Sequence, residues 1–542
     1  MIFFRFLMKY CKGPFYFTIV AGLITGLGLS GLMAVIHRTL ESRPEDYFLL
    51  LLAFISLWII YSILCILSEI YLIVIAEKTA FLMKKALSIQ IFKKELRDLE
   101  EIGPHRLFAI LVEDIKMITS FIEEIPSMFI NGAVCLGCYA YMLWLSPPIF
   151  LFNICFLILS VFIYNVPARL ASRYFMEARE TYDKTIKIFR LMTEGIKNLL
   201  ISSRKRRDYM EKHLNRHNEV LMSQTIRAFS IYRVSRRLGE ILILANIGCL
   251  LFFLSRFLVA DSHIQTGIIL ACLFSLSPLS SLIKNISEWI RVNVAIRKIQ
   301  GYDLDLFKED SKEEAVLSLS SANQYILNQL ILEEIQFEYR SEFNGDRFFV
   351  GPITLRFDSG KITFITGGNG SGKTTLAKII CGLYPPKQGR IIWNNEIIDG
   401  ALREWFSQNF SIIFSDYFLF EYLIGIDPGT IKDQGDRLLK MMELDKKIAI
   451  NDGAFSSIDL SFGQRKRLAL MTACMEDLPV YIFDEWAAGQ APYFKKIFYE
   501  DILQDLKERN KMVIVITHDD NFFHIADQIV KVENGQILKN EI

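Results

Sequence analysis

The stretch that decides the fold of the second half of this chain is Gly367-Gly368-Asn369-Gly370-Ser371-Gly372-Lys373-Thr374. It follows the β-branched stretch Lys361–Thr366 and precedes the apolar stretch Leu376–Cys381, which predicts a strand, a loop and a helix in that order. The pattern GxxxxGK[ST] in this setting is typical of a loop whose backbone N–H groups wrap phosphates, because a Cβ would block the close approach. The strand–loop–helix setting disfavours a chance match.

The residues of this loop have separate expected roles. Lys373 should contact the β- and γ-phosphates of ATP, and Thr374 should ligate Mg²⁺. The positive end of the helix dipole should add to the attraction for phosphate. The expected ATP-binding set here is Gly367, Asn369, Gly370, Ser371, Gly372, Lys373, Thr374 and Thr375.

Two more polar pairs follow strands in the same half. Val480–Phe483 ends in Asp484-Glu485, and Met512–Ile516 ends in Thr517-His518. Ligands of a parallel sheet bind at the carboxyl ends of its strands. We therefore expect Asp484 to hold Mg²⁺, Glu485 to polarise the attacking water and His518 to bond a γ-phosphate oxygen. A plain surface histidine is the alternative for His518, and the order of the motifs disfavours it.

A third motif is Leu460-Ser461-Phe462-Gly463-Gln464, which precedes an expected helix over Arg465–Met475. Ser461 is a suitable N-cap residue, and the first turn of the helix then presents free N–H groups to a phosphate. The motif resembles the LSGGQ signature of ABC-type ATPases. The order of phosphate loop, signature, acidic pair and histidine is similar to that family across the whole second half.

The resemblance implies a dimer. In that family the signature positions, here Ser461, Gly463 and Gln464, contact ATP that is held by the phosphate loop of the partner subunit. Each ATP is then shared by two chains. This chain has one set of these ATP-binding motifs, so the resemblance implies a half-transporter, a subunit with a single ATPase domain. It would pair with a second copy of itself, as a homodimer.

Other positions match or depart from the family pattern. Tyr339 stands where an aromatic residue stacks on adenine, with an ordinary strand aromatic as the alternative. Ser415 takes the place of the family's metal-contacting Gln, and being shorter it should reach Mg²⁺ only through water or a shifted loop. Phe462 replaces the middle Gly of the signature, and Ala491 replaces an Asp that crosses between the motors. Loss of that Asp should weaken coupling between the two ATP sites.

The first half is predicted to span a membrane. Hydrophobic residues make up 52% of the chain, more than its soluble cores need. Six stretches are long and apolar enough, since a spanning helix takes ~20 residues. They lie near Phe15–Ile36, Tyr47–Ile75, Ile125–Leu145, Ile149–Ala168, Leu238–Ala260 and Ile264–Trp289.

Charge sets the expected orientation. The third and fourth stretches are joined by Ser146-Pro147-Pro148, and the fifth and sixth by Asp261-Ser262-His263, so both pairs should be hairpins. The longer connections are basic and helical in pattern, and by the positive-inside rule they lie in the cytoplasm. The basic run Arg204-Lys205-Arg206-Arg207 is interpreted as a solvated helix face near lipid headgroups. We expect a multi-pass protein of the bacterial inner membrane, in contact with lipid, with both termini cytoplasmic.

These observations predict an all-α transmembrane domain of exporter type fused to an α/β P-loop ATPase domain. The expected boundaries are 1–305 for the transmembrane domain, 306–330 for a linker and 331–542 for the ATP-binding domain. A net charge of +1 gives no argument for a nucleic-acid partner, and none is expected.

The likeness is to ABC exporter half-transporters. Phe414–Phe420, Asp484–Ala488 and Thr517–Asp520 resemble the branch that exports cyclic peptides and siderophores, of microcin and pyoverdine type. The leading hypothesis is an ATP-hydrolysing exporter of a peptide, siderophore or related amphipathic compound that works by alternating access. One alternative is a lipid or multidrug flippase. Another is an ATP-dependent membrane sensor that transports nothing. Substrate-stimulated ATPase activity and vesicle transport separate the three.

Overall fold

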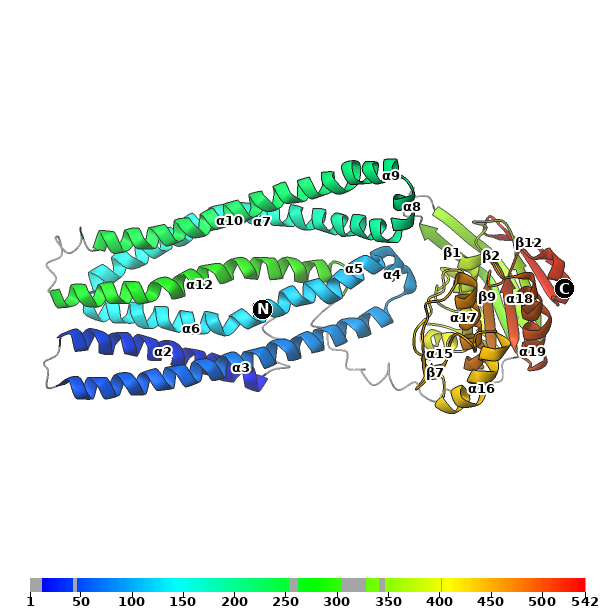
Figure 1. Cartoon of the computed structure of the whole chain (residues 1–542), viewed down its shortest axis with the longest axis horizontal. Coiled ribbons are helices and arrows are strands. Elements are labelled where there is room, and N and C mark those ends of the chain that lie inside the picture. Colours follow the sequence, from blue (N-terminus) through cyan, green and yellow to red (C-terminus); the bar gives the residue numbers. More distant parts are fainter. Residues whose placement is uncertain are drawn as a thin grey trace. The chain divides into compact units, whose positions relative to one another are not determined.

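The computed structural model describes residues 12–41, 46–250, 252, 262–304, 328–340, 347–400 and 402–541. The chain forms two compact units (Figure 1). The first combines 1–93 with 102–310, and the second combines 94–101 with 311–542. A short segment between two long helices of the first half is therefore part of the second unit. The linker expected at 306–330 lies almost entirely outside the described residues.

The first unit is all helical. Its elements are α2 (Lys12–Glu41), α3 (Tyr47–Lys93), α5 (Pro104–Ala109), η2 (Ile110–Asp114), α6 (Ile115–Leu145), α7 (Pro147–Glu194), α8 (Ile196–Ile201), α9 (Ser203–Asp208), η3 (Tyr209–Asn215), α10 (Arg216–Cys249) and α12 (Ser262–Gln300). Helix α7 packs along α10, while α6 packs along both α2 and α12 (Figure 1). Helices α3 and α7 have 47 and 48 residues, so each continues well beyond the ~20 residues that a span needs, while the side of the membrane on which it continues stays a prediction.

Four helical stretches among the described residues are long and apolar enough to cross a membrane: Ile19–Leu40, Tyr47–Lys93, Pro104–Leu145 and Ile264–Asn285. The expected fourth span lies at the start of α7, where the apolar part is Pro147–Ser160. The expected fifth span begins in α10 and continues outside the described residues. Ser146 is extended between α6 and α7, so the first expected hairpin turn is present.

Small residues let α2 and α6 approach closely. A Cβ on Gly26 would lie 2.4 Å from Cβ of Ala133, and a Cβ on Gly137 would lie 2.2 Å from Oγ of Ser30. Both distances are far below van der Waals contact. Apolar helices inside lipid gain little from burial, so close packing of this kind is what holds them together.

The basic run Arg204–Arg207 lies in α9 and not near the expected span. Helices α9, η3 and α10 follow one another without a break from Ser203 to Cys249, and the fifth span is expected to start at Leu238. Some 30 helical residues at 1.5 Å each give about 45 Å between the two. The expectation that this run lies near lipid headgroups stays a prediction, and it requires a span that starts closer to α9 than Leu238.

The second unit is an α/β domain with short helices around its sheets. Its strands are β1 (Gln329–Arg340), β2 (Arg347–Asp358), β3 (Ile362–Thr366), β4 (Gln388–Trp393), β5 (Glu396–Ile398), β6 (Phe410–Ile413), β7 (Ile450–Asn451), β8 (Ala454–Phe455), β9 (Val480–Asp484), β10 (Met512–Ile516), β11 (Gln528–Glu533) and β12 (Gln536–Glu541). Its helices are α4 (Leu96–Ile102, whose last residue belongs to the first unit), α14 (Lys373–Ile380), α15 (Arg403–Ser407), α16 (Pro428–Met441), α17 (Phe462–Glu476), α18 (Pro492–Lys496), η5 (Ile497–Ile502), α19 (Leu503–Glu508) and η6 (Asp520–Ile525).

The central sheet has the order β12-β11-β3-β10-β9-β6, and its five strands from β11 to β6 run parallel. Strands β3, β10, β9 and β6 are thus neighbours, and the loops after them meet at one edge. A second, antiparallel sheet has the order β2-β1-β4-β5. The predicted combination of an all-α domain with long apolar helices and an α/β domain with a largely parallel sheet is present.

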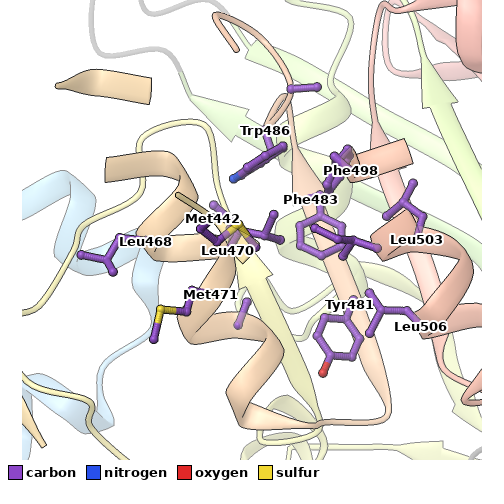
Figure 2. Packing of buried hydrophobic residues seen from close by; sticks show 14 of the residues in the cluster. Met442, Leu468, Leu470, Met471, Tyr481, Phe483, Trp486, Phe498, Leu503 and Leu506 are labelled. Atoms are coloured by element: carbon purple, nitrogen blue, oxygen red, sulfur yellow. The ribbon is translucent and has the colours of Figure 1, made fainter. Parts of the chain in front are cut away.

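The core on one face of the central sheet is built from aromatic and long aliphatic side chains (Figure 2). Trp486 and Phe498 lie 4.5 Å apart between ring centroids, and Phe483 meets Phe498 edge-on at 5.2 Å. Helix α17 contributes Leu468, Leu470 and Met471 to the same cluster. The helix that begins at the signature motif is therefore fixed to the strand that ends at Asp484.

Candidate functional site

The phosphate loop joins β3 to α14 as predicted. Gly367, Gly370 and Gly372 have positive φ angles of 150°, 75° and 103°, which side chains other than glycine rarely adopt. A Cβ on Gly367 would also lie 2.1 Å from the carbonyl oxygen of Val532. The backbone conformation of the loop therefore requires these glycines. Because they have no Cβ, the space beside the loop backbone, the cradle for phosphate, stays open.

Lys373 lies inside that cradle. Its side chain is buried, and Nζ donates to the carbonyl oxygens of Gly367 at 2.8 Å and Gly368 at 3.0 Å. Ser371 is also buried, and its hydroxyl has no hydrogen-bond partner. Asn369 and Thr375 belong to the same loop and helix start. A buried ammonium whose hydrogen bonds go to loop carbonyls can also contact the phosphates of a triphosphate bound in the loop.

Thr374 and Asp484 come together although 110 residues separate them. The Thr374 hydroxyl donates to Asp484 Oδ2 at 2.9 Å, and the other carboxylate oxygen, Oδ1, is buried without a hydrogen-bond partner. Burial raises the pKa of Asp484, while Thr374 and the backbone and hydroxyl groups of Ser415 act in the opposite direction. All three predicted metal residues therefore lie together, and the orphaned oxygen fits a divalent cation.

Glu485 and His518 lie at the ends of neighbouring strands β9 and β10. His518 Nε2 is 3.4 Å from Glu485 Oε1, and Lys373 Nζ is 4.0 Å from the same oxygen. Glu485 has φ of 52°, a left-handed conformation that is strained for a side-chain-bearing residue. Both of the predicted catalytic residues thus face the phosphate loop.

The signature motif forms the start of α17 as predicted. The Ser461 hydroxyl accepts from the Gln464 N–H at 3.4 Å, and Gln464 Oε1 accepts from the Ser461 N–H at 3.2 Å. This reciprocal capping box holds the first turn. Phe462 is exposed next to it, and Gly463 accepts at its carbonyl from the side chain of Gln490 at 3.1 Å.

Two predicted positions are less informative. Tyr339 pairs with Phe348 between β1 and β2, and its side chain lies outside the described ones. Ala491 is the N-cap of α18 and makes no side-chain cap. The structure therefore places the Ala491 backbone but offers no substitute for a carboxylate there.

Sequence reasoning missed a contact with residues 94–101. Glu100 accepts from Lys378 Nζ at 2.7 Å and from the hydroxyl of Tyr384, and Glu95 accepts from Arg403 at 3.3 Å. Tyr384 in turn stacks on Phe337 with ring centroids 4.8 Å apart. The acidic composition of 95–101 was the available signal, but its partners lie some 280 residues later in the chain.

The contacts that fix the turn around His518 were also not predicted from the sequence. The Thr517 hydroxyl bonds the hydroxyl of buried Tyr499 at 2.7 Å. Asp519 accepts from Lys495 Nζ at 2.7 Å. The residues on both sides of His518 are therefore fixed, which sets the direction of the imidazole.

Known proteins resemble this chain over both units. A family model described as ABC transporter matches residues 350–488, and one described as ABC transporter transmembrane region matches residues 14–281. The ATP-binding protein SyrD of Pseudomonas syringae pv. syringae is 28% identical over 535 residues, which cover 97% of this chain and 94% of that protein. The nisin transport ATP-binding protein NisT of Lactococcus lactis subsp. lactis is 30% identical over 258 residues, 44% of this chain and 42% of that protein.

A solved structure has the same fold. It is that of a bacterial Atm1-family ABC exporter with ATP bound, with a TM-score of 0.76 and 14% identity. The alignment covers 98% of this chain and 95% of that one. Both the helical region and the α/β domain therefore have counterparts in that fold.

Proposed function

Because the chain belongs to the ABC transporters, with an exporter-type transmembrane region and an ABC ATPase in one polypeptide, we propose that it exports a peptide, a siderophore or a related amphipathic compound as a homodimer. ATP hydrolysis drives the transport. The observation that carries the proposal is the meeting of Thr374, Asp484, Glu485 and His518 at neighbouring strand ends.

We assign the steps of hydrolysis to these groups. Lys373 and the loop N–H groups bind the phosphates, and Thr374 and Asp484, with Ser415 nearby, would hold Mg²⁺. When bound, Mg²⁺ would neutralise charge on the β- and γ-phosphate oxygens. Glu485 orients the attacking water, and His518, 3.4 Å from the Glu485 carboxylate, bonds a γ-phosphate oxygen.

The dimer follows from the position of the signature. The first turn of α17, which Ser461 caps, presents N–H groups and a positive dipole end to a phosphate. The ATP of the same chain is assigned to its own phosphate loop, which holds Lys373. We assign the signature to ATP held by the second copy. Closure of two such shared sites and their reopening after phosphate release would drive alternating access of the helices.

The character of the cargo is supported by the groups between the helices. Asn131 Nδ2 donates to the hydroxyls of Ser127 and Ser281, both at 3.0 Å, and Asn246 donates to Asn153 at 2.6 Å. These are neutral amide and hydroxyl groups on apolar helices. The same α6 and α12 also carry an ion pair between Lys284 and Glu124 at 3.0 Å, so polar, charged and apolar groups occur together, which suits an amphipathic molecule. A multi-pass location in a bacterial inner membrane, with both termini cytoplasmic, accords with the basic connections.

The test is transport into inside-out proteoliposomes that contain the full chain. We expect ATP-dependent uptake of a cyclic or linear amphipathic peptide or a siderophore, with ATPase activity stimulated by the same compound. Glu485→Gln should still bind ATP while turnover falls by about 100-fold or more. Uptake of labelled lipid or of unrelated drugs instead would favour a flippase, and ATPase activity without uptake of any compound would favour a sensor. Unchanged turnover in Glu485→Gln would remove Glu485 from its role.

A further inference from the structure

Lys466 is a buried lysine on α17 that no role assigned so far uses. Its side chain is 4% exposed, and Nζ donates to three carbonyl oxygens: Glu485 at 2.9 Å, Trp486 at 3.2 Å and Ala488 at 3.0 Å. An ammonium group has three donors, so all of them are used. Burial lowers the pKa of Lys466, and the nearby carboxylates of Glu485 and Asp484 oppose that change. Placing a cation here is costly, which implies that these three bonds serve a purpose.

The segment that Lys466 holds begins with the strained glutamate. Glu485 is in the left-handed region, a conformation that is strained for a residue with a side chain and persists only where neighbours fix it. The Glu485 N–H donates to the Ile516 carbonyl at 3.0 Å, and its carbonyl accepts from Lys466. Both sides of the Glu485 backbone are thereby fixed. Its carboxylate is then directed toward Lys373 and His518.

Further bonds run between the same two elements. The Trp486 indole N–H donates to the Lys466 carbonyl at 2.8 Å, and the Gln490 side chain donates to the Gly463 carbonyl at 3.1 Å. Trp486 also packs in the core beside α17 (Figure 2). Five hydrogen bonds therefore join helix α17 to segment 485–490.

We propose that Lys466 is a positioning residue that fixes Glu485 for water attack and ties it to the signature helix of the same chain. The proposal rests on the proposed function, in which α17 addresses the partner's ATP while Glu485 serves its own. Binding of the partner's ATP at the first turn of α17 then reaches Glu485 itself through Lys466, whose ammonium bonds the Glu485 carbonyl, while the other bonds hold the segment after it. This cis connection supplies coupling in a chain whose residue 491 is Ala and has no carboxylate to reach across.

The test is Lys466→Met in the full-length dimer, because Met is only one atom shorter and keeps an unbranched apolar stem while removing the donors. We expect kcat for ATP to fall by about 10- to 100-fold, the range that displacement of a catalytic group produces. KM and the affinity for a fluorescent ATP analogue should stay within about threefold, because the phosphate loop is untouched. The Hill coefficient for ATP should fall toward one. Lys466→Gln, which keeps two donors, should lie between, and it serves as the variant if Lys466→Met does not purify as a dimer.

A double-mutant cycle separates positioning from a general structural effect. If Lys466 acts through Glu485, Lys466→Met should cause no further loss of single-turnover hydrolysis in a Glu485→Gln background. Lys496→Gln, an exposed lysine in an ion pair with Glu500, is the matched control and should behave as wild type. Unchanged kcat, or losses that multiply in the double variant, would overturn the inference and leave the exporter assignment intact. A wild-type dimer without ATP turnover would instead overturn the proposed function, and the inference with it.

Discussion

Glu100 offers the sharpest test of how the motor is connected to the rest of the chain. The perturbation is Glu100→Ala, which removes the acceptor for Lys378 and Tyr384 from α4. Alanine is the strongest helix former, so α4 itself should persist. The change therefore acts on the attachment of residues 94–101 and not on their helix.

The size of the effect follows from the burial of the three groups. A hydrogen bond to a charged group contributes ~1.5–3 kcal/mol. Lys378 is 16% exposed and Glu100 34%, so solvent screens part of the interaction and the lower end applies. A loss of about 1.5–2 kcal/mol corresponds to a 10- to 30-fold shift in the equilibrium between attached and detached α4.

Hydrogen exchange measured by mass spectrometry reports this equilibrium directly. Amides of residues 94–101 should exchange about 10- to 30-fold faster in Glu100→Ala, while peptides from β3 and β9 should be unchanged. In proteoliposomes the transport per ATP hydrolysed should fall, because the ATPase domain still hydrolyses ATP while α4 is detached from it more of the time. Glu101→Ala, at the exposed neighbouring position, is the control. Unchanged exchange over 94–101, or transport that falls in strict proportion to ATPase activity, would refute the reasoning.

Three further predictions concern the ATPase domain. Burial raises the pKa of Asp484, so the stability that this group contributes is present below the pKa of an unfolded Asp and is lost as pH rises through the pKa in the folded state. Asp484→Asn should therefore raise Tm at neutral pH without nucleotide. A gain in Tm that persists in acid would contradict this. Ser415→Gln should lower the Mg²⁺ concentration that gives half-maximal ATPase activity, because a longer side chain reaches the cation; an unchanged Mg²⁺ titration would count against a metal role for position 415. Phe498→Ala should destabilise the domain by about 3–5 kcal/mol, because the ring is fully buried against Trp486, and a chemical-denaturation midpoint like that of wild type would refute the packing argument.

The sequence predicted the parts of the site that local patterns encode. The strand before the loop, the glycines and the strand that ends at Asp484 are each recognisable within about ten residues, and all appear where expected. The contacts of Lys466 and Glu100 were not predictable in this way. Lys466 lies on a helix whose neighbouring positions are also buried, and its acceptors are backbone carbonyls, which every residue has. Only the packing of α17 against β9 brings them within reach.

Helix α14 shows why these distant contacts belong to one mechanism. Its first residue, Lys373, lies in the phosphate loop, and Lys378 in its last turn donates to Glu100. Lys378 lies five residues after Lys373, so a rise of about 7.5 Å along the helix separates the two positions. A helix of this length transmits a displacement without bending. Phosphate bound at Lys373 would act on residues 94–101 through this short helix, whereas the partner's ATP would act on Glu485 through α17 and Lys466. Loss of Glu100 and loss of Lys466 should therefore impair different steps: transport per ATP in the first case and turnover itself in the second.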